Sequence, residues 1–330
     1  MASFAQFGND LHTGKRSIDF VGRRRTWYLI AAIMIIASLT LPWLRGGYHL
    51  GIEFRGGSEF QVSEVADTSN VSAAEDAVNS VSPGANPRVT IVGNSSVRVQ
   101  TNQMTDADTA TIKDRLAEAY SVSPETVTSS FIGAKWGADV TAMALRALVI
   151  FMLLATVVMA IYFRTWKMSF AAMAALIHDL VITAGVYGIL GFEVTPAAVI
   201  GFLTILGYSL YDTVVVFDKI RENTSEDGEF SRRTFAESVN LAVNQTLVRS
   251  INTSVVAVLP VASILFIGAF VLGAGTLRDI SLALFIGILV GTYSTIFIAA
   301  PTYAALRSRE PEIAKQTERT LAARAASTVE

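Results

Sequence analysis

Six stretches of this chain are long and apolar enough to cross a lipid bilayer, and no other feature limits the possible folds as strongly. A helix that spans a membrane needs about 20 consecutive, mostly apolar residues. The six runs are Trp27–Leu44, Ala144–Phe163, Met168–Leu190, Val194–Phe217, Arg249–Leu272 and Ile280–Tyr303. Very short connections join the second, third and fourth runs, so these helices should be antiparallel neighbours. The sequence therefore predicts an all-α membrane bundle of six transmembrane helices.

The composition agrees with a bilayer as the solvent. Charged residues make up only 16% of the 330 residues, whereas soluble domains carry about 25%. The absence of cysteine excludes disulfides, thiolate metal sites and cysteine nucleophiles. A formal net charge of −2 provides no basic field for nucleic acid. We expect contact with membrane lipid, and we expect no metal, cofactor or nucleic-acid partner.

The first apolar run follows three arginines, Arg23 to Arg25. A cleaved signal peptide begins in a similar way, but it ends at a small-residue cleavage site. This run ends instead in Leu41-Pro42-Trp43-Leu44. We interpret it as an uncleaved helix that anchors the chain in the membrane.

Basic residues in short loops predict the orientation, because lysine and arginine are enriched on the cytoplasmic side. One side of the bundle carries Lys15, Arg16, Arg23–Arg25, Arg164, Lys167, Lys219, Arg221, Arg232, Arg233, Arg307 and Arg309. Outside its polar domain, the other side carries only Arg45, Arg146 and Arg278. Both termini are therefore predicted to be cytoplasmic. The predicted divisions are a cytoplasmic segment at 1–26, a span at 27–44, an extracytoplasmic domain at 45–140, five spans at 141–303 with a cytoplasmic loop at 218–248, and a cytoplasmic tail at 304–330.

The polar segment at 45–140 has the pattern of a small α+β domain. Its predicted elements are a strand at Phe60–Val65, a helix at Ser72–Val81, strands at Arg88–Val92 and Ser96–Thr101, a helix at Thr105–Tyr120 and a strand at Thr126–Ile132. Ser72 with Glu75 suggests a capping box, and Gly93-Asn94-Ser95 suggests a hairpin turn. This β-α-β-β-α-β order is that of a ferredoxin-like domain. It contains no catalytic constellation, so a docking or moving part is the favoured interpretation.

Two ionisable residues lie inside the predicted fourth and fifth spans. Asp212 is in an apolar run, and a charge there costs about 2.5–3.5 kcal/mol on insertion scales. Arg249 begins the next, antiparallel span at a similar depth and shares a helical face with Asn252 and Thr253. The pattern predicts that Asp212 and Arg249 form a pair. The alternatives are an interfacial Asp212 and an arginine that extends to the membrane surface.

His178 and Asp179 lie near the middle of the third span. Either can belong to a proton relay, or the two can fix helix packing by hydrogen bonds. In the fourth span, Gly201 and Gly207 predict close approach to neighbouring helices. Thr234 and Glu237 form a second capping-box pattern, which predicts the start of a cytoplasmic helix that leads into the fifth span.

Several of these residues belong to motifs that resemble the SecF family. The specific motif is the run from Tyr211 to Asn223, which contains Asp212, Asp218 and Arg221, with Lys219 where the family more often has arginine. The elements His178-Asp179 and Asn244–Ser254 are similar to two further family motifs. Gly51-Ile52-Glu53-Phe54-Arg55-Gly56-Gly57 resembles the entry into the family's external domain, with Glu53 in place of aspartate. Its glycines predict a tight turn at the membrane surface.

The resemblance, which extends from Asp19 to about Tyr303, implies a subunit without enzymatic activity in the bacterial cell membrane. Such a subunit is half of a resistance-nodulation-division unit that SecD completes. The unit associates with the SecYEG channel, which the SecA ATPase drives, and often with YajC. It uses the proton-motive force to draw unfolded preproteins outward. Asp212 would be a proton-pathway carboxylate and Arg249 its partner.

Two other functions are compatible with a six-span chain. A small-molecule or lipid exporter of the same superfamily would need far larger external domains than this one. A membrane scaffold without a transport role would not need polar groups buried in three spans.

Overall fold

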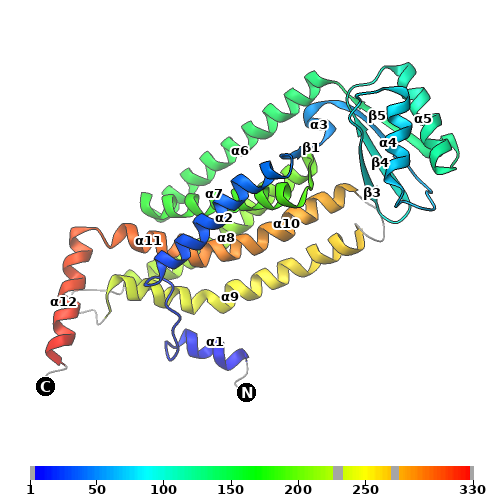
Figure 1. The fold of residues 1–330 in the computed structure, drawn as a ribbon. Helices are drawn as coiled ribbons and strands as arrows, with labels where there is room; N and C mark the ends of the chain where they lie inside the picture. Colours follow the sequence, from blue (N-terminus) through cyan, green and yellow to red (C-terminus); the bar gives the residue numbers. More distant parts are fainter. Residues whose placement is uncertain (1–3, 226–232, 269–274, 328–330) are drawn as a thin grey trace.

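Six long helices form a bundle, and a small sheet domain lies at one end of it (Figure 1). The computed structural model describes residues 4–225, 233–268 and 275–327. The spanning helices are α2 (Arg24–Leu44), α6 (Ala134–Phe163), α7 (Trp166–Leu190), α8 (Pro196–Ser225), α9 (Phe235–Ser263) and α10 (Gly275–Ser294). α9 continues through the π-helical η2 (Ile264–Gly268), and α10 continues through the π-helical η3 (Thr295–Ala299) into α11 (Ala300–Arg307). All six are apolar and long enough to span a membrane, so the predicted six-helix bundle is confirmed.

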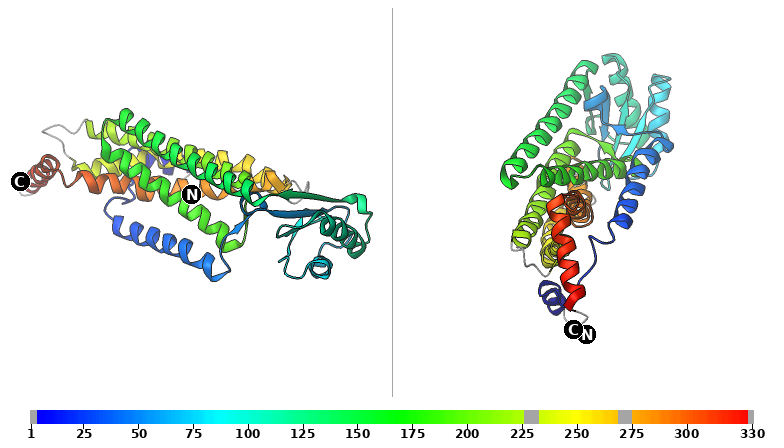
Figure 2. Two further views of the ribbon diagram at one scale, coloured as in Figure 1. Left: turned by 90° about the horizontal axis from the view of Figure 1, so that it is seen from above. Right: turned by 90° about the vertical axis from the view of Figure 1, so that its left-hand side faces the viewer.

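The helices differ strongly in how much of their surface the chain itself covers. In the most apolar stretch of α7, 56% of the residues are buried, but the value for α6 is only 11%. α7, α8 and α10 form the centre of the bundle, while α2 and α6 lie at its edges (Figure 2). The polar residues of the predicted site belong to the central helices and to α9.

The domain is a four-stranded antiparallel sheet with two helices on one face. Its elements are β2 (Gly57–Val62), α4 (Val71–Val81), β3 (Arg88–Val92), β4 (Ser96–Thr101), α5 (Asp106–Tyr120), the 3-10 turn η1 (Pro124–Thr126) and β5 (Val127–Ile132). The sheet order is β3-β4-β2-β5. β3 and β4 form the expected hairpin, in which Val92 pairs with Ser96. The domain has its own hydrophobic core, which includes Phe60, Val99 and Leu116.

Three local predictions need correction. The cap of α4 is Asn70 rather than Ser72, since the Asn70 side chain accepts a hydrogen bond from the Ala73 amide. The first strand lies earlier than predicted, at Gly57–Val62. The predicted loop 218–248 starts as helix, because α8 extends to Ser225, whereas the predicted helix behind the Thr234–Glu237 capping box is confirmed as the start of α9 at Phe235. Polar sequence at these ends reflects helices that continue beyond the apolar layer.

The two ends of the chain also contain helices. α1 (Phe4–His12) packs against α9, and Gln245 donates a hydrogen bond to the His12 carbonyl (3.3 Å). The predicted tail at 304–330 begins within α11 and continues as α12 (Pro311–Ser327), which lies at the end of the bundle farthest from the sheet (Figure 1). Arg324 of α12 is bound to Glu237 of α9 through two hydrogen bonds, so the tail is docked on the bundle. The predicted end of the fifth span, Leu272, lies outside the described residues.

The domain joins the bundle through short elements near the glycine-rich motif. β1 (His49–Leu50) pairs in parallel with β6 (Glu193–Val194), which lies between α7 and α8. The short helix α3 (Ile52–Arg55) follows, and Gly51 caps its start. Gly56 and Gly57 have φ angles of 78° and 139°, which L-residues rarely adopt. These two glycines therefore let the chain leave α3 and enter β2 directly.

Candidate functional site

The buried polar residues of the bundle form two neighbouring groups, one around Asp179 and one around Asp212. Asp179 and His178 of α7 are only 1% and 3% exposed. Asp179 Oδ1 lies 3.2 Å from His178 Nδ1, and Asp179 Oδ2 accepts a hydrogen bond from Ser209 of α8 at 2.6 Å. The sequence thus places a carboxyl group in the centre of the bundle and connects it to α8 by a serine.

Asp212 lies one helical turn beyond Ser209 on α8 and is 4% exposed. Its Oδ1 accepts a hydrogen bond from Ser250 of α9 at 2.8 Å. Its Oδ2 is buried and has no hydrogen-bond partner among the described residues, and the same holds for His178 Nε2. A buried, half-satisfied carboxyl group is costly in a membrane interior, so it needs a proton or a further partner.

The predicted ion pair between Asp212 and Arg249 is not formed. Arg249 is exposed on α9 and makes no ion pair within residues 4–225, 233–268 and 275–327. Its neighbour Ser250 faces Asp212 instead. Consecutive residues of a helix point about 100° apart, so α9 is rotated by one position from the predicted arrangement.

The polar face of α9 that the sequence predicted points away from this bundle. Asn252 is exposed and Thr253 is half-buried, and the Thr253 hydroxyl donates a hydrogen bond to the Arg249 carbonyl of its own helix at 2.8 Å. An arginine and an asparagine on the outside of a spanning helix are expensive in contact with lipid. Among residues 4–225, 233–268 and 275–327, nothing covers Arg249 and Asn252 on this face.

Hydroxyl groups missed by the sequence reasoning extend the Asp212 group along the helices. Ser254 follows Ser250 by one turn of α9, accepts a hydrogen bond from Tyr208 of α8 (3.3 Å) and contacts the Thr292 hydroxyl of α10. The hydroxyl groups in this row, which contact the two aspartates or one another, are those of Ser209, Thr213, Ser250, Ser254, Thr292 and Thr295. Their signal is the i, i+4 spacing of Ser209 with Thr213 and of Ser250 with Ser254, which aligns small polar groups on one face.

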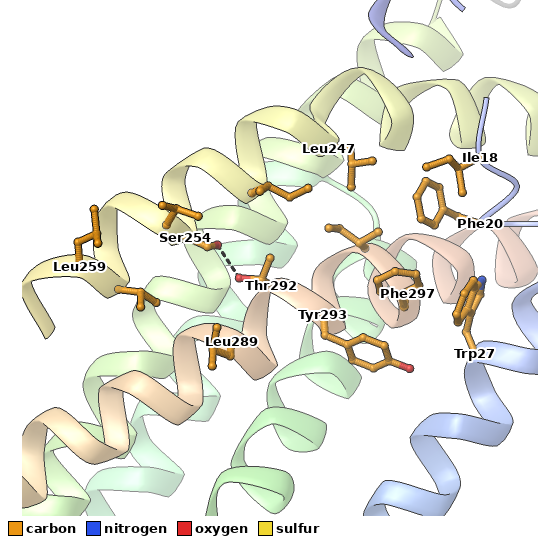
Figure 3. A pocket seen from close by; sticks show the side chains of 14 residues that line it. Ile18, Phe20, Trp27, Leu247, Ser254, Leu259, Leu289, Thr292, Tyr293 and Phe297 are labelled. Carbon is orange, nitrogen blue, oxygen red and sulfur yellow. Dashed lines mark hydrogen bonds between the residues drawn. The ribbon is translucent and has the colours of Figure 1, made fainter. Parts of the chain in front are cut away.

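This row of hydroxyl groups ends, at Ser254 and Thr292, beside an apolar cavity of about 660 Å³ between α2, α9 and α10. Figure 3 shows the Ser254–Thr292 hydrogen bond at its wall, with Phe20, Trp27 and Phe297 grouped at one end. Almost all lining side chains are apolar, so the cavity offers no continuation for the polar line. Within the described residues, no group of three or more histidine, aspartate or glutamate side chains is arranged to hold a metal ion.

Most of the remaining motif residues lie at the two ends of the bundle, whereas Tyr211 directly precedes Asp212 on α8. Asp218 accepts a hydrogen bond from the Tyr162 hydroxyl of α6 (2.9 Å), and Asn223 donates one to Gln245 of α9 (2.9 Å). Tyr211 and Arg221 are exposed. Gly51, Gly56 and Gly57 lie at the junction with the domain. Asp218 and Asn223 thus connect helices, and the three glycines shape the turn, away from the buried carboxyl groups.

Comparison with known proteins agrees with this architecture. The family described as "Protein export membrane protein SecD/SecF, C-terminal" matches residues 111–309. The protein translocase subunit SecF of Streptomyces coelicolor is 45% identical over 98% of this chain and 86% of the relative, and that of Rhodothermus marinus is 35% identical over 88% and 93%.

A solved structure resembles the chain as well. The crystal structure of SecDF from Thermus thermophilus, a translocon-associated membrane protein, has a TM-score of 0.77 and 28% identity. The match covers 89% of this chain but only 39% of the SecDF chain, so this chain spans about two fifths of that larger protein. The family resemblance of the motifs is confirmed: the chain belongs to the SecF family of protein translocase subunits.

Proposed function

We propose that this chain, together with a SecD-like partner, uses the proton-motive force to promote preprotein export through a SecYEG channel supplied by SecA. YajC is an accessory partner of the same assembly. The observation that carries the proposal is the burial of Asp179 and Asp212 inside spanning helices, with hydroxyl groups as their α8 and α9 partners. Carboxyl groups at such positions are expensive unless they exchange protons or pair with a cation.

In this mechanism Asp212 alternates between two states. When protonated, it keeps the Ser250 contact seen here. When ionised, it attracts Arg249, which is the preceding residue of α9 and needs a rotation of about 100° to reach the same place. Helix interfaces are bistable rather than continuously deformable, so proton exchange would move α9 between two positions. One proton that crosses about 100 mV supplies about 2.3 kcal/mol.

Asp179 and His178 are the proposed relay to Asp212. Ser209 supports this role, because it binds Asp179 from a position one turn before Asp212 on the same helix. Asn252 and Thr253 are proposed to line the surface that the partner covers, next to Arg249. The alternative for all four residues is a purely structural role in helix packing.

The sheet domain is proposed to be ferredoxin-like, extracytoplasmic and in contact with emerging preprotein. Its element order and the sheet order β3-β4-β2-β5 support the first point. Movements of α9 would change its tilt, so that it grips or releases an extended chain. A small-molecule exporter is less well supported, since the external domain is a single small sheet with two helices.

The proposed orientation can be tested with single cysteines, because the natural chain has none. Ser129 of β5 and Ser225 of α8 are both exposed. An impermeant maleimide applied to intact cells should label Ser129→Cys and leave Ser225→Cys unlabelled until the membrane is opened. Labelling of Ser225→Cys alone would reverse the orientation.

The exposed polar face of α9 predicts a stable complex with a SecD-like chain. Substitution of Asn252 by leucine should weaken co-purification of that chain at least several-fold, because an apolar group cannot satisfy a buried polar partner. Leu259→Ala on the same helix changes an exposed apolar residue and serves as the matched control. Undiminished recovery of the partner with Asn252→Leu would place the interface elsewhere.

A further inference from the structure

A second cluster of carboxyl groups lies where the sheet domain meets the bundle, far from Asp212. At its centre is Glu193 of β6, which is 8% exposed. The amide of Gln100 in β4 donates hydrogen bonds both to Glu193 Oε1 (2.6 Å) and to Glu59 Oε2 of β2 (2.9 Å). A single side chain of the sheet thus bridges a carboxyl group of the domain and one of the bundle.

One arginine serves both of these carboxyl groups. Arg98 Nε lies 3.6 Å from Glu59 Oε1, and Arg98 Nη1 lies 3.8 Å from Glu193 Oε2. Helix α10 confines the arginine, because a Cβ at Gly275 would lie 2.6 Å from Arg98 Nη2. The guanidinium therefore lies between the sheet and the start of α10.

Glu53 of α3 adds a third carboxyl group. A Cβ at Gly51 would lie 2.3 Å from Glu53 Oε2 and 3.2 Å from Glu193 Oε1, so both groups converge on this glycine. Glu53 Oε2 is buried without a hydrogen-bond partner among the described residues. Three carboxyl groups face one guanidinium, and like charges this close favour the uptake of a proton.

The surrounding charges, among them that of Arg88 on Glu193, offset this excess only in part. The Arg88 guanidinium of β3 donates to the Gly191 carbonyl (3.1 Å), and Arg278 is bound to Asp279 of α10. Asp279 also accepts a hydrogen bond from Thr195 (2.9 Å). Arg55 and His49 are further charged or titratable groups near Arg88 among the described residues. A cavity of about 290 Å³, lined in part by Glu53, Glu59, Arg98 and Asp279, gives solvent protons access to the cluster.

We propose that this junction is a proton-dependent latch between the sheet domain and the bundle. A proton shared by the carboxyl cluster holds the domain against β6 and α10. Loss of that proton leaves mutually repelling carboxylates on the two sides of the contact, and the domain separates from the bundle. The latch adds to the proposed proton coupling and does not depend on it, because its titrating groups are Glu53 and Glu193 rather than Asp212.

The direction of the pH dependence follows from burial. Desolvation raises the pKa of Glu193 above its usual value, and the contacts with Gln100 and Arg98 oppose this only in part. Desolvation also raises the pKa of Glu53, with a contribution from the charges of Glu193 and Glu59. A carboxyl group with a raised pKa in the docked state binds its proton more tightly there. Docking is therefore fully favoured below the ordinary glutamate pKa and weakens as the pH rises through the raised value.

The distance between domain and bundle tests the latch directly. Spin labels are attached at Ala110→Cys on α5 and Ile200→Cys on α8, both of which are exposed positions. The distance between the labels is measured by double electron–electron resonance on the full chain in lipid nanodiscs, from pH 4 to pH 9 in roughly one-unit steps. The expected result is a docked population that decreases as the pH rises. A distance distribution that does not change with pH would overturn the proposal.

Two substitutions should change this response in opposite directions. Glu193→Gln keeps the shape of the side chain but cannot ionise, so the pH response should be largely lost and the docked state retained. Gln100→Glu adds a fourth carboxyl group, so docking should require a lower pH. Glu75→Gln, an exposed change in α4, should leave the response unchanged. If both junction variants respond to pH like the unchanged chain, the latch proposal is wrong. Because the measurement does not involve preprotein export, its result is independent of the proposed coupling at Asp212.

Discussion

Replacement of Asp212 by asparagine is expected to abolish the gradient-dependent part of preprotein release while leaving the fold intact. Asparagine is nearly isosteric with aspartate, and its carbonyl oxygen can still accept the Ser250 hydrogen bond that Asp212 Oδ1 accepts now. It cannot bind and release a proton. Release from membrane vesicles, measured with and without a proton gradient, should therefore fall to the level seen without the gradient.

The controls separate chemistry from structure. Glu222→Gln makes the same change from acid to amide at an exposed position of α8 and should release preprotein normally. Arg249→Lys should be partly impaired, because lysine keeps the charge but loses the planar fork, and Arg249→Ala should lose most of the gradient response. If assembled Asp212→Asn complexes keep full gradient-dependent release, Asp212 is a packing residue and the proposed coupling mechanism is wrong.

The second large effect is structural and concerns two glycines of α8. A Cβ at Gly201 would lie 2.6 Å from the Ala283 Cβ and 3.1 Å from the Ile280 carbonyl oxygen of α10. A Cβ at Gly207 would have no heavy atom within 4 Å. Gly201→Leu should therefore force α8 and α10 apart and destabilise the bundle by about 3 kcal/mol. Gly207→Leu should not lower the stability of the isolated chain. The leucine side chain has room there, and leucine favours the helix over glycine by a little less than about 1 kcal/mol.

Unfolding of the purified chain in mixed micelles measures this difference, with helix content as the signal. The pair is closely matched, because both substitutions are made on the same helix with the same residue type. Equal stability of the two variants would show that α8 and α10 leave room for a side chain at Gly201. A loss of stability at Gly207 alone would mean that this face is covered within the chain.

The sequence predicts the spans well because hydropathy over about 20 residues is a local property. It also predicts the order of the domain elements, since strands and helices have different periods. Neither the loop 218–248 nor the cap of α4 could be predicted as reliably. Helices can continue into water beyond the apolar layer, as α8 does to Ser225, and Asn70 and Ser72 are equally good caps by residue type.

The candidate site shows a different limit. The depth of Asp212 in the membrane follows from counting residues, but the rotation of α9 does not. Whether Arg249 or Ser250 faces Asp212 depends on how α9 packs against α8 and α10, which the sequence of one helix does not encode. For the same reason the sequence suggested close packing at both Gly201 and Gly207, whereas only Gly201 touches a neighbour.

The parallel pairing of β1 with β6 has a consequence for how the protein is made. His49 pairs with Glu193, so the two partners are separated by 144 positions in the chain. At ribosomal rates of about 5–20 residues per second, the second partner is synthesised roughly 7–30 seconds after the first. The sheet domain, which has its own hydrophobic core, can fold during that interval, but its attachment site on the bundle does not yet exist. Docking of the folded domain must therefore wait until β6 has been made, and a nascent chain that stalls before β6 leaves that domain without its attachment site.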